Sequence, residues 1–379
     1  MSHPFAEYRR LFPILQQAAQ LSSCSQSAMS LPVRDAITQY LDGWEKRGMD
    51  WGGWMEGVAG ARAEFARLIG ASLDDIAVLG SVSDAASSVV SSLSFPAERR
   101  YVVASTLDFP SLCHVWLAQE PRGAKVRFVE GRPGVDDAAA RLSAAVADDT
   151  AVVAVSHASF YDGQLTDLAA SAQAAHEHGA LQFVDAYQSA GSVPIDVVAQ
   201  GVDVLAAGAQ KYLLGIPGIA FLYVSPARAA QLQPAVTGWF GRVEPFAFDP
   251  RKLDFPATGA KFNTGTPPML PAAAAHAALR LLNEIGVEAI QGWLRQLSAV
   301  AMAEADALGL EVVSPRNLDA KGGNTAIRVA GASAVEQAMA QRGYIVSARN
   351  DVIRIAPHFY NTVDEVAGAV RTLAELVNG

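Results

Sequence analysis

Hydrophobic and polar residues alternate along this chain with two different periods. Near the start, residues 31–48 (LPVRDAITQYLDGWEKRG) and 54–71 (WMEGVAGARAEFARLIGA) carry apolar side chains at i, i+3 and i+4 and a glycine near the end. This pattern predicts two amphipathic helices. Further along, short runs of Val, Leu, Ile and Ala alternate with helical segments such as 83–93 and 165–179. Strands that are apolar on both faces are typical of a parallel sheet covered by helices on both sides, so the predicted fold class is α/β.

Six strands of this sheet can be located from the pattern. They are residues 75–80, 100–105, 151–157, 181–185, 202–209 and 219–225. The last strand follows its predecessor too closely for a helical crossover, so we expect it to run antiparallel.

The character of the sequence changes at residues 234–268, which are rich in Pro, Gly and aromatic residues and show no period. Such stretches are usually binding loops or domain connections. The helices and short strands after them read as a separate α+β module. We therefore predict an N-terminal segment (1–20) that packs on the small domain, a large domain (21–255) and a small C-terminal domain (256–379).

Composition narrows the class of protein. The 379 residues are 51% hydrophobic and 18% charged, as in globular proteins. No apolar run reaches the roughly 20 residues of a membrane span, and the charged N-terminus with Pro13 is unlike a signal peptide, so we expect a cytoplasmic protein that does not bind membranes. The net charge of −9, without a Lys/Arg cluster, argues against nucleic acid and favours a small-molecule partner. Cys24 and Cys113 have neither disulfide-framework nor zinc spacing, and no metal site is expected.

Chemistry-bearing residues follow four of the predicted strands. Ligands of open α/β sheets bind beyond the carboxyl ends of the strands. There the chain places a polar turn with Ser83 at a helix start, Phe109 in TLDFPS, Asp185 in VDAYQSAG, and the pair Gln210-Lys211. A helix start binds anions, and an aromatic ring offers a flat face.

An anion cradle, an aromatic face, a carboxylate and a lysine together suit pyridoxal phosphate. Lys211 would form the Schiff base, and Asp185 would pair with the pyridinium nitrogen. Small apolar residues and glycines surround Lys211, so desolvation should lower its pKa and make its amine nucleophilic.

With these motifs the sequence resembles the class V aminotransferase family of fold-type I pyridoxal-phosphate enzymes, which includes cysteine desulfurases, isopenicillin N epimerase-like proteins and kynureninases. The resemblance covers nearly the whole chain and implies a large domain with a mainly parallel seven-stranded sheet plus a smaller α+β domain. By this resemblance, Asp185 of the D-x-x-Q segment contacts the pyridine nitrogen and Gln188 the ring hydroxyl. Lys211, 26 residues after Asp185, carries the cofactor, and Phe109 stacks on its ring.

The resemblance also implies the remaining ligands. The Val82 amide and Ser83 bind the phosphate, and Gln210 stands where the family often has His or Tyr. Thr266, in FNTGTPP, reaches the phosphate of the neighbouring subunit, which implies a homodimer with its sites at the interface. Arg354, in VIRIAPHFYNTVDEV, clamps the substrate α-carboxylate, a task that suits the fork of a guanidinium.

Two residues depart from the family pattern, and several simpler interpretations stay open. Gly208 lies where many relatives have a phosphate-binding Ser, and Phe160 replaces a polar residue that relatives often place near the ring. Asp185 could merely cap a turn, Phe109 could belong to the core, and His157 could either touch the cofactor or only end its strand.

The sequence predicts a pyridoxal-phosphate enzyme acting on a small α-amino acid through Lys211. TGWFG and GTPP look kynureninase-like, which places a lyase or hydrolase slightly ahead of an aminotransferase; a non-catalytic pyridoxal-phosphate-binding protein is the alternative of another class. A cysteine desulfurase is disfavoured because its nucleophilic Cys lies in the C-terminal third, and no Cys follows Cys113.

Cys24 lies in a region that approaches the active site in relatives, but an inert thiol is the simpler interpretation. A dinucleotide-binding protein lacks support because no G-x-G-x-x-G follows the early strands.

Overall fold

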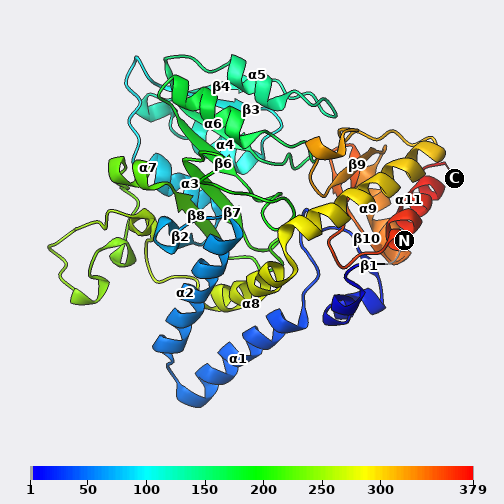
Figure 1. Ribbon diagram of the computed structural model, residues 1–379, viewed down its shortest axis with the longest axis horizontal. Helices are drawn as coiled ribbons and strands as arrows, with labels where there is room; N and C mark the ends of the chain where they lie inside the picture. The colour runs from blue at the N-terminus through cyan, green and yellow to red at the C-terminus, as the bar shows by residue number, and fades with distance from the viewer. Residues whose placement is uncertain (1–2, 379) are drawn as a thin grey trace.

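A seven-stranded sheet forms the centre of the computed structural model, which describes residues 3–378 (Figure 1). The strand order is β2-β8-β7-β6-β5-β3-β4, and β8 runs antiparallel to both of its neighbours while the other pairs are parallel. This confirms the predicted fold class and the antiparallel strand after Lys211. The strands are β2 (Ile76–Leu79), β3 (Tyr101–Ser105), β4 (Lys125–Val129), β5 (Thr150–Ser156), β6 (Leu181–Asp185), β7 (Val204–Gly208) and β8 (Ala220–Val224).

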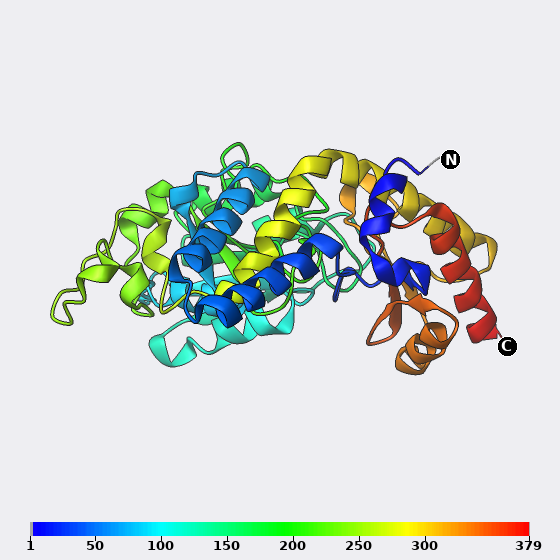
Figure 2. The ribbon, with the colours of Figure 1, turned by 90° about the horizontal axis from the view of Figure 1, so that it is seen from below.

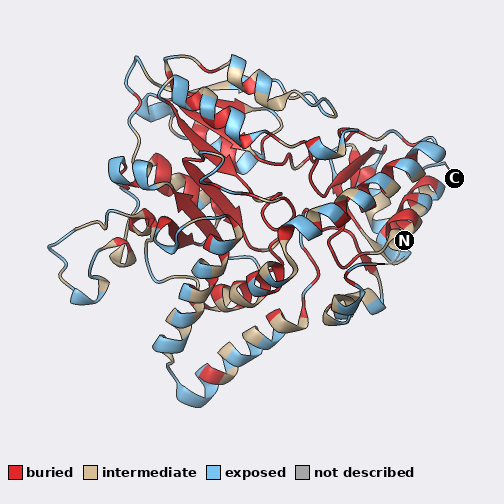
Figure 3. Ribbon diagram, viewed as in Figure 1, coloured by how far each residue is buried: buried red, intermediate tan, exposed pale blue. Residues whose placement is uncertain are grey.

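Both faces of the sheet are buried, as the apolar strands require. On β7, Val204 and Ala206 pack into one core with α3 (Val82–Val90) and α4 (Pro110–Leu117). Leu205 and Ala207 face a second core with α2 (Trp51–Leu68) and α8 (Met269–Ile285). Figure 3 shows this burial concentrated along the central strands. The helices of the two layers include α3 (Val82–Val90), α4 (Pro110–Leu117), α5 (Ala138–Ala144), α6 (Leu168–Glu177) and α7 (Pro226–Gln231).

The helices α1 (Leu31–Arg47), α2 (Trp51–Leu68) and α8 (Met269–Ile285) pack together on one side of the sheet (Figure 1). Ser30 caps α1 by accepting a 3.4 Å hydrogen bond from the amide of Val33. Because α8 packs along α1 and α2, we propose that the smaller domain begins after α8 rather than at residue 256; the other boundaries stay predictions.

The C-terminal unit combines α9 (Val287–Ala307), α10 (Ala332–Gln341) and α11 (Val363–Asn378) with a three-stranded antiparallel sheet. The strands of that sheet are β9 (Thr325–Arg328), β11 (Ser347–Arg349) and β12 (Val352–Ile355). The N-terminal segment lies against this unit (Figure 2), where the short strand β1 (Ala19–Gln20) pairs with β10 (Tyr344–Ile345). The rings of Phe5 and Phe12 contact Phe359, with centroids 5.8 and 5.7 Å apart.

The sequence pattern did not locate β4 or the short helix α5. β4 is one of the two edge strands, and it is exposed or half-buried at every position, whereas the other edge strand, β2, is buried throughout; β4 therefore lacks the apolar run that marks the other strands. The aperiodic segment 234–268 contains only short 3-10 turns. The 3-10 helices are η1 (Ala6–Leu11), η2 (Pro13–Gln16), η3 (Leu73–Asp75), η4 (Glu120–Arg122), η5 (Trp239–Gly241), η6 (Pro245–Ala247), η7 (Gly259–Phe262) and η8 (Leu318–Ala320). Among residues 3–378, no helix has the length and apolar character needed to span a membrane.

Candidate active site

A cavity of about 400 Å³ lies at the carboxyl ends of the parallel strands and gathers most of the residues predicted from sequence. Eight of the nine line it: Val82, Ser83, Phe109, Asp185, Gln188, Gln210, Lys211 and Arg354. The ninth, Thr266, is exposed and does not line this cavity. Its predicted role toward a second subunit stays a prediction.

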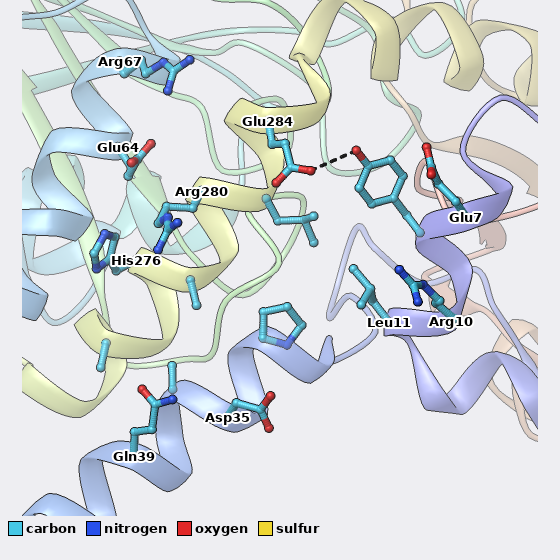
Figure 4. Close-up of a pocket in the computed structure, with 16 residues that line it drawn as sticks. Glu7, Arg10, Leu11, Asp35, Gln39, Glu64, Arg67, His276, Arg280 and Glu284 are labelled. Carbon is cyan, nitrogen blue, oxygen red and sulfur yellow. Dashed lines mark hydrogen bonds between the residues drawn. The ribbon is translucent and has the colours of Figure 1, made fainter.

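A larger groove of about 1030 Å³ lies elsewhere, between the N-terminal segment, α1, α2 and α8 (Figure 4). Acidic and basic side chains are mixed along it, and Tyr8 donates a 3.1 Å hydrogen bond to Glu284 there. None of the predicted site residues lines this groove, so size alone does not mark the site.

Lys211 follows β7 and points into the cavity between two aromatic rings. Its Nζ lies 4.1 Å from the ring centroid of Tyr187 and 5.5 Å from that of Phe109. Burial lowers the pKa of Lys211 to about 8, against the opposing charge of Asp185. A sizeable fraction of this amine is therefore neutral near physiological pH.

Asp185 ends β6 and is buried at the floor of the cavity. Its Oδ1 accepts a 2.9 Å hydrogen bond from the amide of Tyr187, so the turn-capping interpretation is correct for one of its oxygens. Burial raises the pKa of Asp185, while the Tyr187 amide and Lys211 oppose that rise. Asp185 and Lys211 both line the cavity, and among the described residues no salt bridge joins them directly.

Asp108 holds the aromatic loop in place, a role that the sequence did not reveal. Its carboxylate accepts hydrogen bonds from the amides of Ser105 (2.8 Å) and Ser156 (3.1 Å), at the ends of β3 and β5. Burial raises the pKa of Asp108 to about 6. The bridge fixes the backbone immediately before Phe109.

Two glutamines tie the stretch just before α1 to the cavity. Gln188 donates a 3.0 Å hydrogen bond to the carbonyl of Cys24, and Gln210 donates one of 3.4 Å to that of Ser25. The Oε1 of Gln188 is buried with no donor within residues 3–378. A buried acceptor without a donor is costly, so a ligand that donates to it would be favoured. Cys24 is buried and also lines the cavity.

The start of α3 supplies an anion-binding edge. Ser81 caps the helix by accepting a 3.1 Å hydrogen bond from the amide of Asp84. The amides of Val82 and Ser83 belong to the first turn, and the side chains of Ser81 and Ser83 line the cavity. The positive end of the helix dipole therefore faces the same space as Lys211.

Phe109 and Phe160 form an edge-to-face pair with ring centroids 5.2 Å apart. Phe109 is 37% exposed and lines the cavity, so it is not an ordinary core residue. Phe160 also lines the cavity, in the place where the sequence showed a departure from the family. The pair gives this wall of the site an apolar surface.

Arg354, on β12, is fully buried and reaches the cavity from the C-terminal unit. Its guanidinium donates to the carbonyl of Phe160 (2.7 Å) and to the hydroxyl of Ser25 (3.0 Å). No acidic side chain among the described residues forms a salt bridge with it. A buried cation without a counter-ion favours an anionic ligand.

His157 is buried outside the cavity lining. Burial lowers its pKa to about 4, and its backbone amide donates to the carbonyl of Asp185. The structure thus favours the strand-end interpretation over a cofactor contact.

Several residues that line the cavity were not singled out by the sequence analysis, and three of them carry polar side chains that bear on the site. Tyr187 lies inside the D-x-x-Q segment, Ser25 next to Cys24, and Arg349 at the end of β11. Nothing in the sequence indicated them beyond their closeness to the named motifs, because only the folded chain brings these three residues to one cavity.

Comparisons with known proteins agree with this geometry. A family model described as aminotransferase class-V matches residues 25–367. The chain is 41% identical to the protein named uncharacterized aminotransferase YcbU of Bacillus subtilis (strain 168) over 376 residues, covering 99% of this chain and 98% of that one. It is 30% identical to a kynureninase of Pseudomonas fluorescens over 292 residues, covering 74% and 68%. An apo cysteine desulfurase from Thermococcus onnurineus NA1 shares the fold, with a TM-score of 0.88 at 22% identity over 100% of this chain and 99% of that chain.

Proposed function

The chain belongs to the class V aminotransferase family, and we propose that it is a pyridoxal-phosphate-dependent enzyme that acts on a small α-amino acid. The observation that carries the proposal is one cavity that holds a half-buried lysine of lowered pKa, a buried aspartate and a buried arginine: Lys211, Asp185 and Arg354. Pyridoxal 5'-phosphate is the cofactor of this family.

The residues of the cavity fit this cofactor. The unpaired Oε1 of Gln188 suits the ring hydroxyl, and the buried carboxylate of Asp185 suits a protonated ring nitrogen. The first turn of α3, with Ser83, suits the phosphate. Phe109 offers a partly exposed ring face, and Lys211 offers an amine of lowered pKa.

Each of the three charged residues of the cavity has a separate role in the proposed chemistry. When bound, pyridoxal phosphate supplies an aldehyde that links to amines and a ring that withdraws electrons from the substrate Cα. Lys211 would hold the cofactor through its amine and, as a free amine, would accept the proton from the substrate Cα. Asp185 keeps the ring nitrogen protonated through its negative charge. Arg354 would bind the α-carboxylate of the substrate through its guanidinium, which would fix the position of the substrate in the cavity.

A lyase or hydrolase of kynureninase type is the proposed reaction class. Its support is the similarity to a kynureninase and the apolar wall formed by Phe109 and Phe160. An aminotransferase is the second candidate, because the Bacillus subtilis protein that is 41% identical over 99% of this chain is named an aminotransferase. A non-catalytic pyridoxal-phosphate-binding protein would keep the same cavity.

We further propose that the enzyme is not a cysteine desulfurase, although one shares its fold. No Cys follows Cys113 in the chain. Cys24 lines the cavity, but its carbonyl accepts a hydrogen bond from Gln188 and the residue is buried in the stretch before α1.

We also propose a cytoplasmic homodimer in which Thr266 serves the partner's site. Its support is the exposure of Thr266 and of apolar side chains on and near α1, namely Leu41 (49%), Trp44 (56%) and Met49 (71%). Light scattering after gel filtration tests it: a monomer at micromolar concentration would contradict the proposal.

Absorbance spectra during incubation with a panel of amino acids, including kynurenine and cysteine derivatives, test the reaction. Mass spectrometry then identifies products and cofactor. Conversion of the cofactor to pyridoxamine phosphate together with a keto acid identifies an aminotransferase. Return of pyridoxal phosphate with cleavage of the amino acid identifies a lyase or hydrolase. A bound cofactor that no amino acid in the panel alters supports the non-catalytic alternative.

A further inference from the structure

Tyr187 fills the space that a side chain at position 208 would need. Gly208 ends β7, and its φ is not in the left-handed region, so its backbone does not require glycine. A Cβ atom built there would lie 2.2 Å from Cε2, 2.3 Å from Cζ and 2.5 Å from Oη of Tyr187. Unbonded heavy atoms do not approach so closely, so it is the phenol ring that requires glycine at 208.

The hydroxyl of Tyr187 is free to bind a ligand. The residue is half-buried and lines the cavity, and its hydroxyl makes no hydrogen bond to any residue within 3–378. Burial, and secondarily the charge of Asp185, raises the pKa of Tyr187 to about 12. At neutral pH the group is therefore a proton donor facing the cavity.

The surroundings of Tyr187 show what kind of group it would meet. Its ring packs against the apolar cluster that includes Val82, at the start of α3. Its ring centroid is 4.1 Å from Lys211 Nζ, and its amide donates to Asp185. The hydroxyl thus belongs to the same cavity as Ser83 and the first turn of α3, whose donors favour an anion.

We propose that Tyr187 binds the cofactor by donating a hydrogen bond from its hydroxyl to the phosphate, and that position 208 is glycine because a larger residue would leave no room for the Tyr187 ring. The inference rests on the proposed function, because it requires pyridoxal phosphate in this cavity.

The variant Tyr187→Phe keeps the ring and removes only the hydroxyl. Titration of the cofactor-free protein with pyridoxal phosphate and with pyridoxal, which lacks the phosphate, separates the two parts of the ligand. We expect the variant to bind pyridoxal phosphate about tenfold more weakly and pyridoxal as the wild type does. Tyr40→Phe, another half-buried tyrosine, which stacks on Trp54, is the matched control and should change neither. Equal binding of pyridoxal phosphate by wild type and Tyr187→Phe, or an equal loss for both ligands, overturns the proposal.

The pairing with Gly208 has its own test. Gly208→Ser should weaken pyridoxal-phosphate binding because its Cβ displaces the phenol ring, whereas Gly292→Ser, at a glycine with open space around it, should not. The double variant Tyr187→Ala/Gly208→Ser should bind within threefold of the wild type, because serine then fits and offers a hydroxyl. A double variant that binds no better than Tyr187→Ala overturns the pairing.

The two proposals fail in distinguishable ways. A wild-type protein that binds no pyridoxal phosphate refutes the proposed function. A wild type that binds it, with Tyr187→Phe unaffected, refutes only the role of Tyr187. Thermal melting without cofactor verifies that each variant is folded.

Discussion

Arg354 on β12 donates a 2.7 Å hydrogen bond from Nη1 to the carbonyl oxygen of Phe160, on the loop after β5 and 194 residues away in the chain. Nη2 of the same guanidinium reaches Ser25 Oγ, so three distant segments meet at one buried cation. The proposed carboxylate site is therefore built across the junction of the C-terminal unit and the main sheet.

Arg354→Lys should raise the KM for the amino-acid substrate by about 10- to 100-fold, because an ammonium cannot bind both carboxylate oxygens and cannot keep both existing hydrogen bonds. Steady-state kinetics with the amino acid found in the panel measure this. Arg251→Lys, at an exposed arginine, is the control. An unchanged KM in a folded Arg354→Lys protein would show that the carboxylate binds elsewhere.

Lys211→Ala should abolish covalent capture of pyridoxal phosphate and lower turnover by at least about 1000-fold, since the variant loses both the anchor and the base. Borohydride reduction followed by mass spectrometry detects the covalent link. Lys125→Ala, on the exposed edge strand β4, should behave as the wild type. Full turnover in Lys211→Ala would refute the assignment of this residue.

The rate of covalent capture should depend on pH through the neutral fraction of Lys211. The pKa of Lys211 is lowered to about 8 by burial, so the rate should rise about tenfold per pH unit below pH 8 and level off above it. Stopped-flow absorbance of the cofactor-free protein mixed with pyridoxal phosphate measures the profile. For comparison, the capture rate of a free lysine side chain would level off only near its pKa of about 10.4. A protein profile that rises until pH 10 would contradict the desolvated lysine.

Lys321 provides a prediction about stability outside the site. It is 2% exposed, and its Nζ donates to Ser298 Oγ (2.9 Å) and to the carbonyl of Gly322 (3.0 Å). Burial lowers its pKa to about 7, so between pH 7 and about 10.5 the unfolded state binds more protons than the folded state. The free energy of unfolding should therefore rise with pH across this window.

Lys321→Met should remove this rise, which we expect to amount to roughly 2–4 kcal/mol. Urea unfolding at pH 7 and pH 10 measures the difference in each protein. Lys125→Met, at an exposed lysine, should keep the wild-type pH dependence. Parallel pH profiles for wild type and Lys321→Met would show that Lys321 is not the group responsible.

Local sequence predicted the parts of the fold whose pattern repeats within one element. The central strands could be located as apolar runs because both of their faces are buried. Helices such as α1 and α8 could be located because their apolar residues recur with the helical period. β4 was not located because its residues are exposed or half-buried, so its sequence carries no such run. The grouping of α8 with the later helices rested on sequence order, whereas its apolar side packs against α1 and α2.

For the site, the sequence by itself determined which residues follow the strands, and the rule that ligands bind at strand ends pointed to Asp185, Gln210 and Lys211, which line one cavity. Only the tertiary structure decided which distant side chains join them: Gln188 meets Cys24 across 164 residues, and Tyr187 lies over Gly208. The physical reason is that periodicity records burial along one element, whereas the contacts of a cavity depend on how separate elements pack. The local sequence therefore gave no indication that the Tyr187 ring occupies the space beside Gly208.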